Sequence, residues 1–170
     1  MKIKENLIFL GMMGSGKTSI GLLVSKRLNR NFIDVDHEIE KILDMKISEI
    51  FEMKGEDYFR KIEEKITLSM LKKKNNVISL GGGAFLNNNI KNEILKKHIS
   101  FWLDWNPQTL VNRIYKSAKR PITHKATRND LIEMINKRSK IYSKALYKID
   151  CENLSKNKIA EKIIKIYENI

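Results

Sequence analysis

The sequence predicts an α/β fold in which a five-stranded parallel sheet is flanked by helices. Five short apolar runs are separated by stretches of helical length, which is the pattern of strands joined by crossover helices. The runs are nearly continuous rather than alternating, as is typical of strands buried on both faces. Two of the runs end in glycine-rich turns, where the backbone can approach a ligand closely.

The first half of the chain is expected to hold two strands and three helices. The first strand, "NLIFL", precedes a helix from about Gly16 to Leu28. The second strand, "NFIDVD", precedes a helix from Asp36 to about Leu43. A longer charged helix is expected through "EDYFRKIEEKITLSMLKK", and Ser48 is a candidate N-cap before the intervening turn "EIFEMKG".

The second half is expected to hold the strands "NVISL", "HISFWLDW" and "LYKIDC". Pro107 suits the first turn of a helix, and Asp130 the start of the helix "LIEMINKRSKIYSKA". The segment between them, "KSAKRPITHKATRND", lacks periodicity and is interpreted as a mobile loop. The final helix places three isoleucines on one face: Ile159, Ile163 and Ile166.

Length and composition favour a single intracellular domain. The chain has 170 residues, of which 42% are hydrophobic, so one core over residues 1–170 is expected. The run "LIFLGMM" is short and interrupted by glycine, which favours a buried strand over a signal sequence or a membrane span. Cys151 is the only cysteine and is expected in the core. These features predict a cytoplasmic protein without a membrane partner.

The formal net charge of +13 suits either nucleic acid or an anionic small molecule. The lysines do not gather in one block, and the densest runs, "LKKKNN" and "ILKKH", are placed where helices or loops meet solvent. We therefore expect a small-molecule substrate and no nucleic-acid partner. A heptad pattern or an exposed apolar stripe is not evident, so a monomer is expected.

Gly11, Gly16, Lys17 and Thr18 match the phosphate-binding pattern G-x-x-x-x-G-K-[ST], with a strand before it and a helix after it. Glycines let several backbone N–H groups point into one concavity, and the helix N-terminus adds partial positive charge. Lys17 can reach the β- and γ-phosphates, and the Thr18 hydroxyl can ligate Mg²⁺. The loop is therefore predicted to bind a nucleoside triphosphate.

ATP is favoured over GTP as that nucleotide. The guanine-reading pattern N-K-x-D would be expected after a strand. The nearest match, "NKRS", lacks the aspartate and lies within a predicted helix.

Asp34 and Asp36 end the second predicted strand, at the edge of the sheet where doubly wound folds bind ligands. Strand alternation places both side chains on one side. One could anchor Mg²⁺ through water, and the other could bind an acceptor hydroxyl. Either could instead cap the following helix, and Asp36 is the better candidate for that role.

Arg60 lies on the next helix, with Glu63 and Glu64 three and four residues further on. Either carboxylate could hold the guanidinium on that helix face. The same spacing is also typical of an exposed and weak salt bridge.

A second glycine turn, Gly81-Gly82-Gly83, follows the third strand and allows close approach of a ligand. Arg120 lies in the irregular loop, where an arginine can close over a transferring phosphoryl group. Arg138 lies on the following helix and could face the acceptor. Both arginines could also be solvated surface charges.

Together these residues resemble the shikimate kinase family. The shared features follow the phosphate loop in the same order and with closely similar spacing: Asp34-x-Asp36, Gly55-Glu56-x-x-Phe59-Arg60, Gly81-Gly82-Gly83, Arg120-Pro121 and Arg138-x-x-x-Tyr142. The phosphate loop alone is common to many kinases, whereas the combination is much more specific. The resemblance covers nearly the whole chain.

The resemblance implies a P-loop kinase fold related to nucleoside monophosphate kinases. It implies a substrate-binding segment at about residues 36–64 and a mobile lid at about residues 116–127. The implied reaction transfers the γ-phosphoryl group of ATP to the 3-hydroxyl of shikimate, a step toward chorismate and the aromatic amino acids.

The resemblance also assigns roles. Nucleotide contacts fall to Gly14, Ser15, Gly16, Lys17, Thr18, Ser19 and Arg120. Magnesium falls to Thr18 and, through water, Asp34. Shikimate contacts fall to Asp36, Arg60, Gly81, Gly82 and Arg138, and catalysis to Lys17, Asp36 and Arg120.

Two segments depart from the family pattern. The lid reads "RPIT", where leucine commonly follows the proline, and the late adenine-contacting loop should lie near the unusual "CENLS". Arg113 is a further candidate for contact with adenine, although it could equally be a surface charge on a helix.

Two alternatives remain open at this point. One is another small-molecule kinase of the same fold, such as a gluconate or nucleotide kinase, and a nucleotide acceptor would need more phosphate-facing arginines. The other is a P-loop regulatory or nucleic-acid-binding protein, which would explain the charge but not the paired aspartates or Arg60.

Overall fold

The computed structural model describes residues 6–117 and 126–170. Five parallel strands form one sheet in the order β2-β3-β1-β4-β5, which confirms the predicted sheet. The strands are β1 (Leu7–Leu10), β2 (Asn31–Asp34), β3 (Asn76–Ser79), β4 (Ile99–Asp104) and β5 (Tyr147–Asp150).

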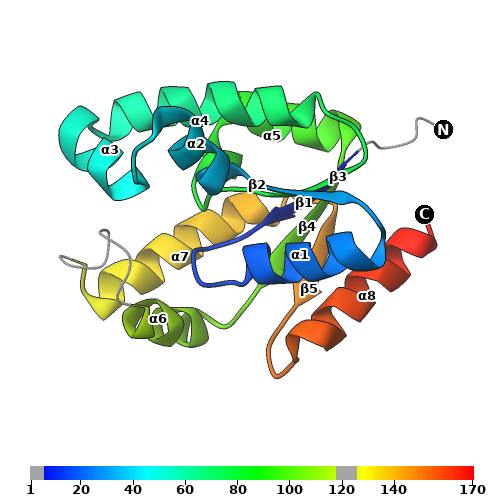
Figure 1. Ribbon diagram of the computed structural model, residues 1–170. Coiled ribbons are helices and arrows are strands. Elements are labelled where there is room, and N and C mark those ends of the chain that lie inside the picture. Colours follow the sequence, from blue (N-terminus) through cyan, green and yellow to red (C-terminus); the bar gives the residue numbers. More distant parts are fainter. Residues whose placement is uncertain (1–5, 118–125) are drawn as a thin grey trace.

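Helices cover both faces of the sheet, as Figure 1 shows. Helices α1 and α8 pack together on one face, while α4, α5 and α7 cover the other. The helices are α1 (Lys17–Arg27), α2 (Val35–Leu43), α3 (Ile47–Lys54), α4 (Glu56–Leu71), α5 (Asn88–Lys97), α6 (Pro107–Lys116), α7 (Arg128–Tyr142) and α8 (Lys156–Glu168), with the 3₁₀ turn η1 (Ala84–Leu86).

Strand β1 occupies the centre of the sheet, with Leu7 opposite both Val77 of β3 and Ile99 of β4. The chain leaves β1 toward β2 on one side and leaves β3 toward β4 on the other. Connections that diverge in this way open a crevice at the carboxyl ends of the two neighbouring strands, where α/β proteins bind ligands.

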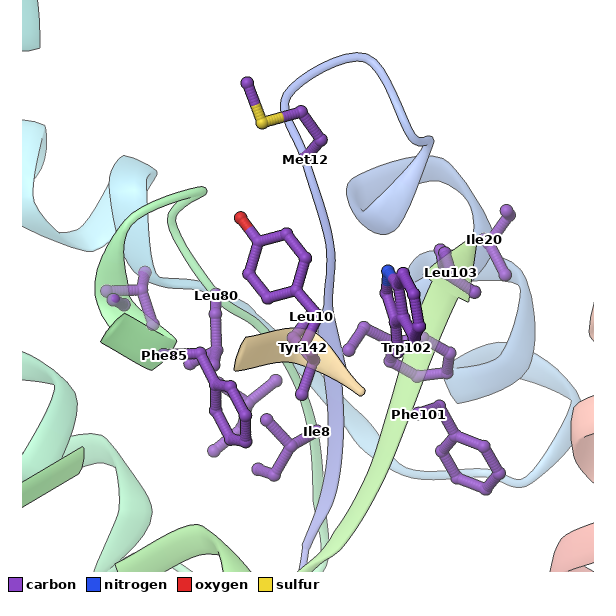
Figure 2. Close-up of a cluster of buried hydrophobic side chains, with 14 of the residues drawn as sticks. Ile8, Leu10, Met12, Ile20, Leu80, Phe85, Phe101, Trp102, Leu103 and Tyr142 are labelled. Carbon is purple, nitrogen blue, oxygen red and sulfur yellow. The ribbon is translucent and has the colours of Figure 1, made fainter. Parts of the chain in front are cut away.

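The core fills both sides of the sheet. All four residues of β1 are at most 1% exposed. Figure 2 shows Ile8 and Leu10 of β1 among side chains from other elements, including Phe85 of η1, Trp102 of β4 and Tyr142 of α7. This packing places β1 rigidly beneath the loop that follows it.

The prediction that Asp36 ends a strand was wrong. Strand β2 stops at Asp34, and Asp36 lies in the first turn of α2. Asp34, rather than Asp36, caps this helix, because its Oδ1 accepts a hydrogen bond from the backbone N–H of His37 at 3.3 Å. An aspartate is a strong N-cap, so the strand ends two residues earlier, and the helix begins one residue earlier, than predicted.

Two helices were not predicted. The segment interpreted as a turn is α3, which begins at Ile47, so Ser48 is not its N-cap. Glu49 instead accepts a hydrogen bond from the backbone N–H of Lys46 at 2.7 Å. Helix α5 lies in an asparagine-rich stretch whose composition disfavours helix. It forms because Asn87 caps it and because Ile90 and Ile94 are fully buried.

Other local predictions are confirmed. Pro107 opens α6, and Asp130 lies in the first turn of α7. Cys151 is buried, and burial, assisted by Asp150 and Asp104, raises the pKa of its thiol to about 12. Among the helices of the described ranges, none has the length and apolarity of a membrane span.

The buried side chain of Asn6 ties β1 to its neighbours. Its Nδ2 donates to the carbonyls of Leu71 at 3.2 Å and Lys73 at 2.7 Å, and its Oδ1 accepts from the N–H of Asn76 at 2.9 Å. We expect Asn6→Ala to lower the free energy of unfolding by about 2 kcal/mol, because buried backbone groups lose their partners. Urea unfolding measures the change.

The exposed Asn92 of α5 offers a matched control. Asn92→Ala should leave stability within about 0.5 kcal/mol. Equal losses in the two variants would contradict the bridging role assigned to Asn6.

Candidate functional site

The loop between β1 and α1 has the glycine conformations that a phosphate-binding loop requires. Gly14 and Gly16 have φ values of 78° and 89°, a region that favours glycine. The Lys17 ammonium folds back over the loop and donates to the carbonyls of Gly11 at 2.9 Å and Met12 at 3.0 Å. The loop is thus held in shape with its cation at the start of α1, which suits binding of polyphosphate.

Thr18 and Asp34, the predicted metal pair, are in direct contact. The hydroxyl of Thr18, on α1, donates a hydrogen bond to Oδ2 of Asp34, at the end of β2, at 2.6 Å. Both side chains offer oxygen ligands beside the phosphate loop. Oxygen ligands are the type that Mg²⁺ prefers when phosphates supply its other ligands. Within the described ranges, groups of three or more His, Cys, Asp or Glu side chains able to hold a metal ion are absent.

A cavity of about 540 Å³ opens beside the phosphate loop, between α2, α3, α4 and the second glycine turn. Its charged and backbone lining includes Asp34, Asp36, Arg60, Glu63, Gly82 and Arg138. The structure therefore gathers residues that lie more than 100 positions apart in the sequence.

Arg60 is fixed in this cavity by two carboxylates of its own helix. Its Nη1 donates to Glu63 Oε2 at 2.7 Å, and its Nε and Nη2 donate to Glu56 Oε1 at 3.2 and 3.0 Å. Burial works against the charge of Arg60, but Glu63 and Glu56 together raise the pKa of the guanidinium. The guanidinium also lies 5.2 Å from the ring centre of Phe59.

Glu63, rather than Glu64, is the partner of Arg60. Glu63 is 2% exposed, so this is not the weak surface pair that the helix spacing also allowed. Glu64 faces away and accepts hydrogen bonds from the side chains of Asn87 at 2.8 Å and Asn89 at 2.7 Å.

Two of the three residues in the second glycine turn, Gly81 and Gly83, have charged side-chain atoms too close for a Cβ. A Cβ on Gly81 would lie 2.6 Å from Asp36 Oδ1 and 2.7 Å from Glu63 Oε1, and one on Gly83 would lie 2.4 Å from Arg60 Nη1. Gly82 and Gly83 line the cavity, whereas Gly81 packs against the two carboxylates. Gly81 and Gly83 therefore let charged groups from α2 and α4 approach the backbone after β3.

Arg138 and Tyr142, one turn apart on α7, both reach the carbonyl of Gly82. Arg138 Nη1 lies 3.4 Å from this oxygen and 3.8 Å from Met12 Sδ, and the Tyr142 hydroxyl also donates to it. Figure 2 shows the hydroxyl end of Tyr142 on the same side as Met12. Burial raises the pKa of Tyr142 to about 12, so the phenol remains a donor at neutral pH.

Arg113 lies beside the phosphate loop. Its guanidinium carbon is 3.6 Å from the ring centre of Trp105, and its Nη1 is 3.4 Å from the carbonyl oxygen of Gly14. Arg120, the predicted lid arginine, lies outside the described residues, as does most of the predicted lid.

Sequence reasoning assigned no role to two of these residues. Glu56 precedes Arg60 by four positions, a helix spacing that could have indicated the second carboxylate. Trp105 carried no signal, because its partners Ser15 and Arg113 come from other elements.

A glycine-rich phosphate loop beside a cavity lined by two arginines and several carboxylates, among which Glu63 is buried, defines a P-loop kinase for a small acceptor. The family model for shikimate kinase matches residues 13–168. The chain is 40% identical over 167 residues to the shikimate kinase of Thermodesulfovibrio yellowstonii, covering 98% of this chain and 96% of that one. It is 38% identical over 164 residues to the shikimate kinase of Bacillus subtilis, covering 95% of this chain and 88% of that one. The chain therefore belongs to the shikimate kinase family.

Solved structures agree with this assignment. A shikimate kinase from Acinetobacter baumannii in complex with shikimate superposes with a TM-score of 0.92 and 28% identity, covering 99% of this chain and 95% of that chain. The shikimate kinase from Aquifex aeolicus superposes with a TM-score of 0.86 and 33% identity, covering 96% of each chain. A deoxyadenosine kinase from M. mycoides gives 0.65 at 18% identity over 97% of this chain and 100% of that one, which shows the shared nucleoside-kinase-like fold.

The buried carboxyl of Glu63 should make stability depend on pH. Burial raises its pKa, Arg60 only partly offsets this, and Asp36 adds to it. A raised native pKa adds stability below the unfolded value of about 4.3, and this contribution is lost as pH rises through the native pKa. Relative to Glu63→Gln, the wild type should therefore lose unfolding free energy as the pH rises above the unfolded pKa of about 4.3.

Glu64→Gln is the matched control with the opposite sign. Hydrogen bonds from Asn89 and Asn87 lower the pKa of Glu64, so its contribution is present above the unfolded pKa and is lost as pH falls. Urea unfolding followed both above and below the unfolded pKa of about 4.3 distinguishes the two, because the Glu63 effect develops above that pH and the Glu64 effect below it. Slopes of the same sign in both variants would contradict the assignment.

Proposed function

We propose that this chain transfers the γ-phosphoryl group of ATP to the 3-hydroxyl of shikimate, giving shikimate 3-phosphate and ADP on the route to chorismate and the aromatic amino acids. The observation that carries the proposal is the pairing of Arg60 and Arg138 with Asp36 in one cavity beside the phosphate loop. Membership of the family and the likeness to a relative solved with shikimate support it.

The cavity suits a carboxylated polyol. Guanidinium groups bind a carboxylate through charge-assisted hydrogen bonds, and Arg60 and Arg138 supply two. Asp36 can accept a hydrogen bond from the reacting hydroxyl, and its proton as the bond to phosphorus forms. The backbone of Gly82, held through its carbonyl by Tyr142, presents a further anchor.

The nucleotide is assigned to the phosphate loop. The loop backbone from Gly14 to Ser19 would hold the phosphates, and Lys17 would neutralise charge on the β- and γ-phosphates. Arg120 is proposed to contact ATP as the lid arginine. Thr18 and, through water, Asp34 would hold Mg²⁺, which when bound neutralises phosphate charge. Phosphoryl transfer needs mainly positioning and charge stabilisation, so the chain's task is to orient donor and acceptor.

Three further expectations stay predictions. These are a monomeric state, a cytoplasmic location and the absence of a nucleic-acid partner. Size-exclusion chromatography and heparin retention at moderate salt test the first and the third.

The direct test measures ADP release with Mg-ATP and shikimate, against gluconate, nucleoside monophosphates and no acceptor. We expect release with shikimate alone. Asp36→Asn should lower kcat by about 100-fold or more, because the acceptor hydroxyl loses its proton acceptor. ADP release that is indifferent to shikimate would leave the phosphate loop in place and refute the acceptor assignment.

Gly83→Ala tests the geometry of the acceptor subsite. Gly83 has right-handed helical dihedrals that alanine also adopts, so the new methyl should act by displacing the guanidinium of Arg60. We expect KM for shikimate to rise about tenfold or more, as for loss of a charged hydrogen bond, with KM for ATP unchanged.

A double-mutant cycle with Arg60→Ala provides the control. If the methyl acts through Arg60, Gly83→Ala should add little in that background. Additive increases in KM would show that the methyl acts on another part of the cavity.

A further inference from the structure

Trp105 lies between the phosphate loop and the helix that carries Arg113. It follows β4, is 7% exposed, and does not line the acceptor cavity. The roles proposed for phosphate, metal and acceptor binding leave this large buried indole without a task. Besides its place in the core, its hydrogen bond and its ring contact go to the phosphate loop and to Arg113.

One contact fixes the indole to the phosphate loop. Trp105 Nε1 donates to the carbonyl of Ser15 at 2.9 Å, in a buried hydrogen bond between positions 90 residues apart. Buried indole N–H groups need a partner, and this one sets the orientation of the ring. The hydrogen bond therefore fixes the orientation of the indole ring relative to the loop that is assigned to the phosphates.

The other contact carries Arg113. The guanidinium carbon lies 3.6 Å from the indole ring centre, well within cation–π range. The same side chain reaches back to the loop, with Nη1 3.4 Å from the carbonyl oxygen of Gly14. A guanidinium stacked by one face on an indole is oriented to stack by its other face on an aromatic heterocycle.

We propose that Trp105 is a positioning residue for the nucleotide base. Its N–H hydrogen bond to the Ser15 carbonyl orients the indole ring, and the ring holds Arg113 where the base of ATP stacks. This inference rests on the proposed function for the identity of the nucleotide. It assigns to an indole at the end of β4 the task of linking the base subsite to the phosphate subsite.

Steady-state kinetics test the role. Trp105→Leu removes both the ring and the N–H group, and KM for ATP should rise about fivefold to tenfold, the loss expected for one partly exposed cation–π contact. Trp105→Phe keeps an aromatic face and should restore part of this loss. In both variants kcat and KM for shikimate should stay within about twofold, because uniform nucleotide binding is what is removed.

A cycle with Arg113→Met identifies the route of the effect. If Trp105 acts through Arg113, Trp105→Phe should change KM for ATP little further in the Arg113→Met background. Additive effects would overturn the proposal, as would an unchanged KM for ATP in Trp105→Leu. Should the leucine variant fail to fold, the phenylalanine variant and this cycle still decide the question.

The second tryptophan, Trp102, supplies an internal spectroscopic control. Its ring centre lies 6.2 Å from that of Tyr142, on the acceptor side. Trp102→Phe leaves Trp105 as the sole tryptophan, and its emission should change on titration with ADP. Trp105→Phe leaves Trp102, whose emission should respond far less to ADP. Equal responses in the two single-tryptophan variants would contradict the proposal.

The fluorescence titration requires no turnover. A Trp105 signal with ADP alongside ADP release indifferent to shikimate would uphold the role of Trp105 and refute the proposed acceptor. Shikimate-dependent ADP release without a change in Trp105 emission would uphold the proposed acceptor and refute the role of Trp105.

Discussion

Two glycine turns must lie side by side for this site to exist. Strands β1 and β3 are neighbours in the sheet, and each ends in a glycine-rich segment at the same edge. The first segment leaves room for phosphates, and the second lets carboxylates and a guanidinium approach the backbone within distances that any side chain would block. The proposed donor and acceptor subsites meet because the connections leaving β1 and β3 diverge.

In the acceptor cavity, the negative charge of a buried carboxylate is partly balanced by a neighbouring guanidinium. Arg60 is held by Glu63 and Glu56, while Asp36 lies close to Glu63 across Gly81. Burial makes the negative charge of Glu63 unfavourable, and Arg60 only partly offsets this. Such a pair contributes little to stability, but it removes the freedom of a long cationic side chain. We infer that this order is retained for binding, because a fixed guanidinium loses less entropy when a carboxylate arrives.

Many elements could be predicted from local pattern. The phosphate loop, the buried strands and the helix opened by Pro107 each carry a signal within a few residues. Helix α5 could not be predicted in this way, because its asparagines disfavour helix and its stability comes from burying Ile90 and Ile94. The end of β2 was misplaced for a related reason, since a strand pattern and an aspartate N-cap compete over the same residues.

The sequence by itself determined the class of chemistry, because the phosphate loop depends on glycine conformation and on a lysine and threonine at set positions. It also determined which charged residues were candidates for the acceptor. Only the tertiary structure decided between Glu63 and Glu64 as partner of Arg60, and only it brought Trp105 against Ser15 and Arg113. Those outcomes depend on which side of a helix or strand faces the neighbouring element, and packing between distant segments sets that orientation.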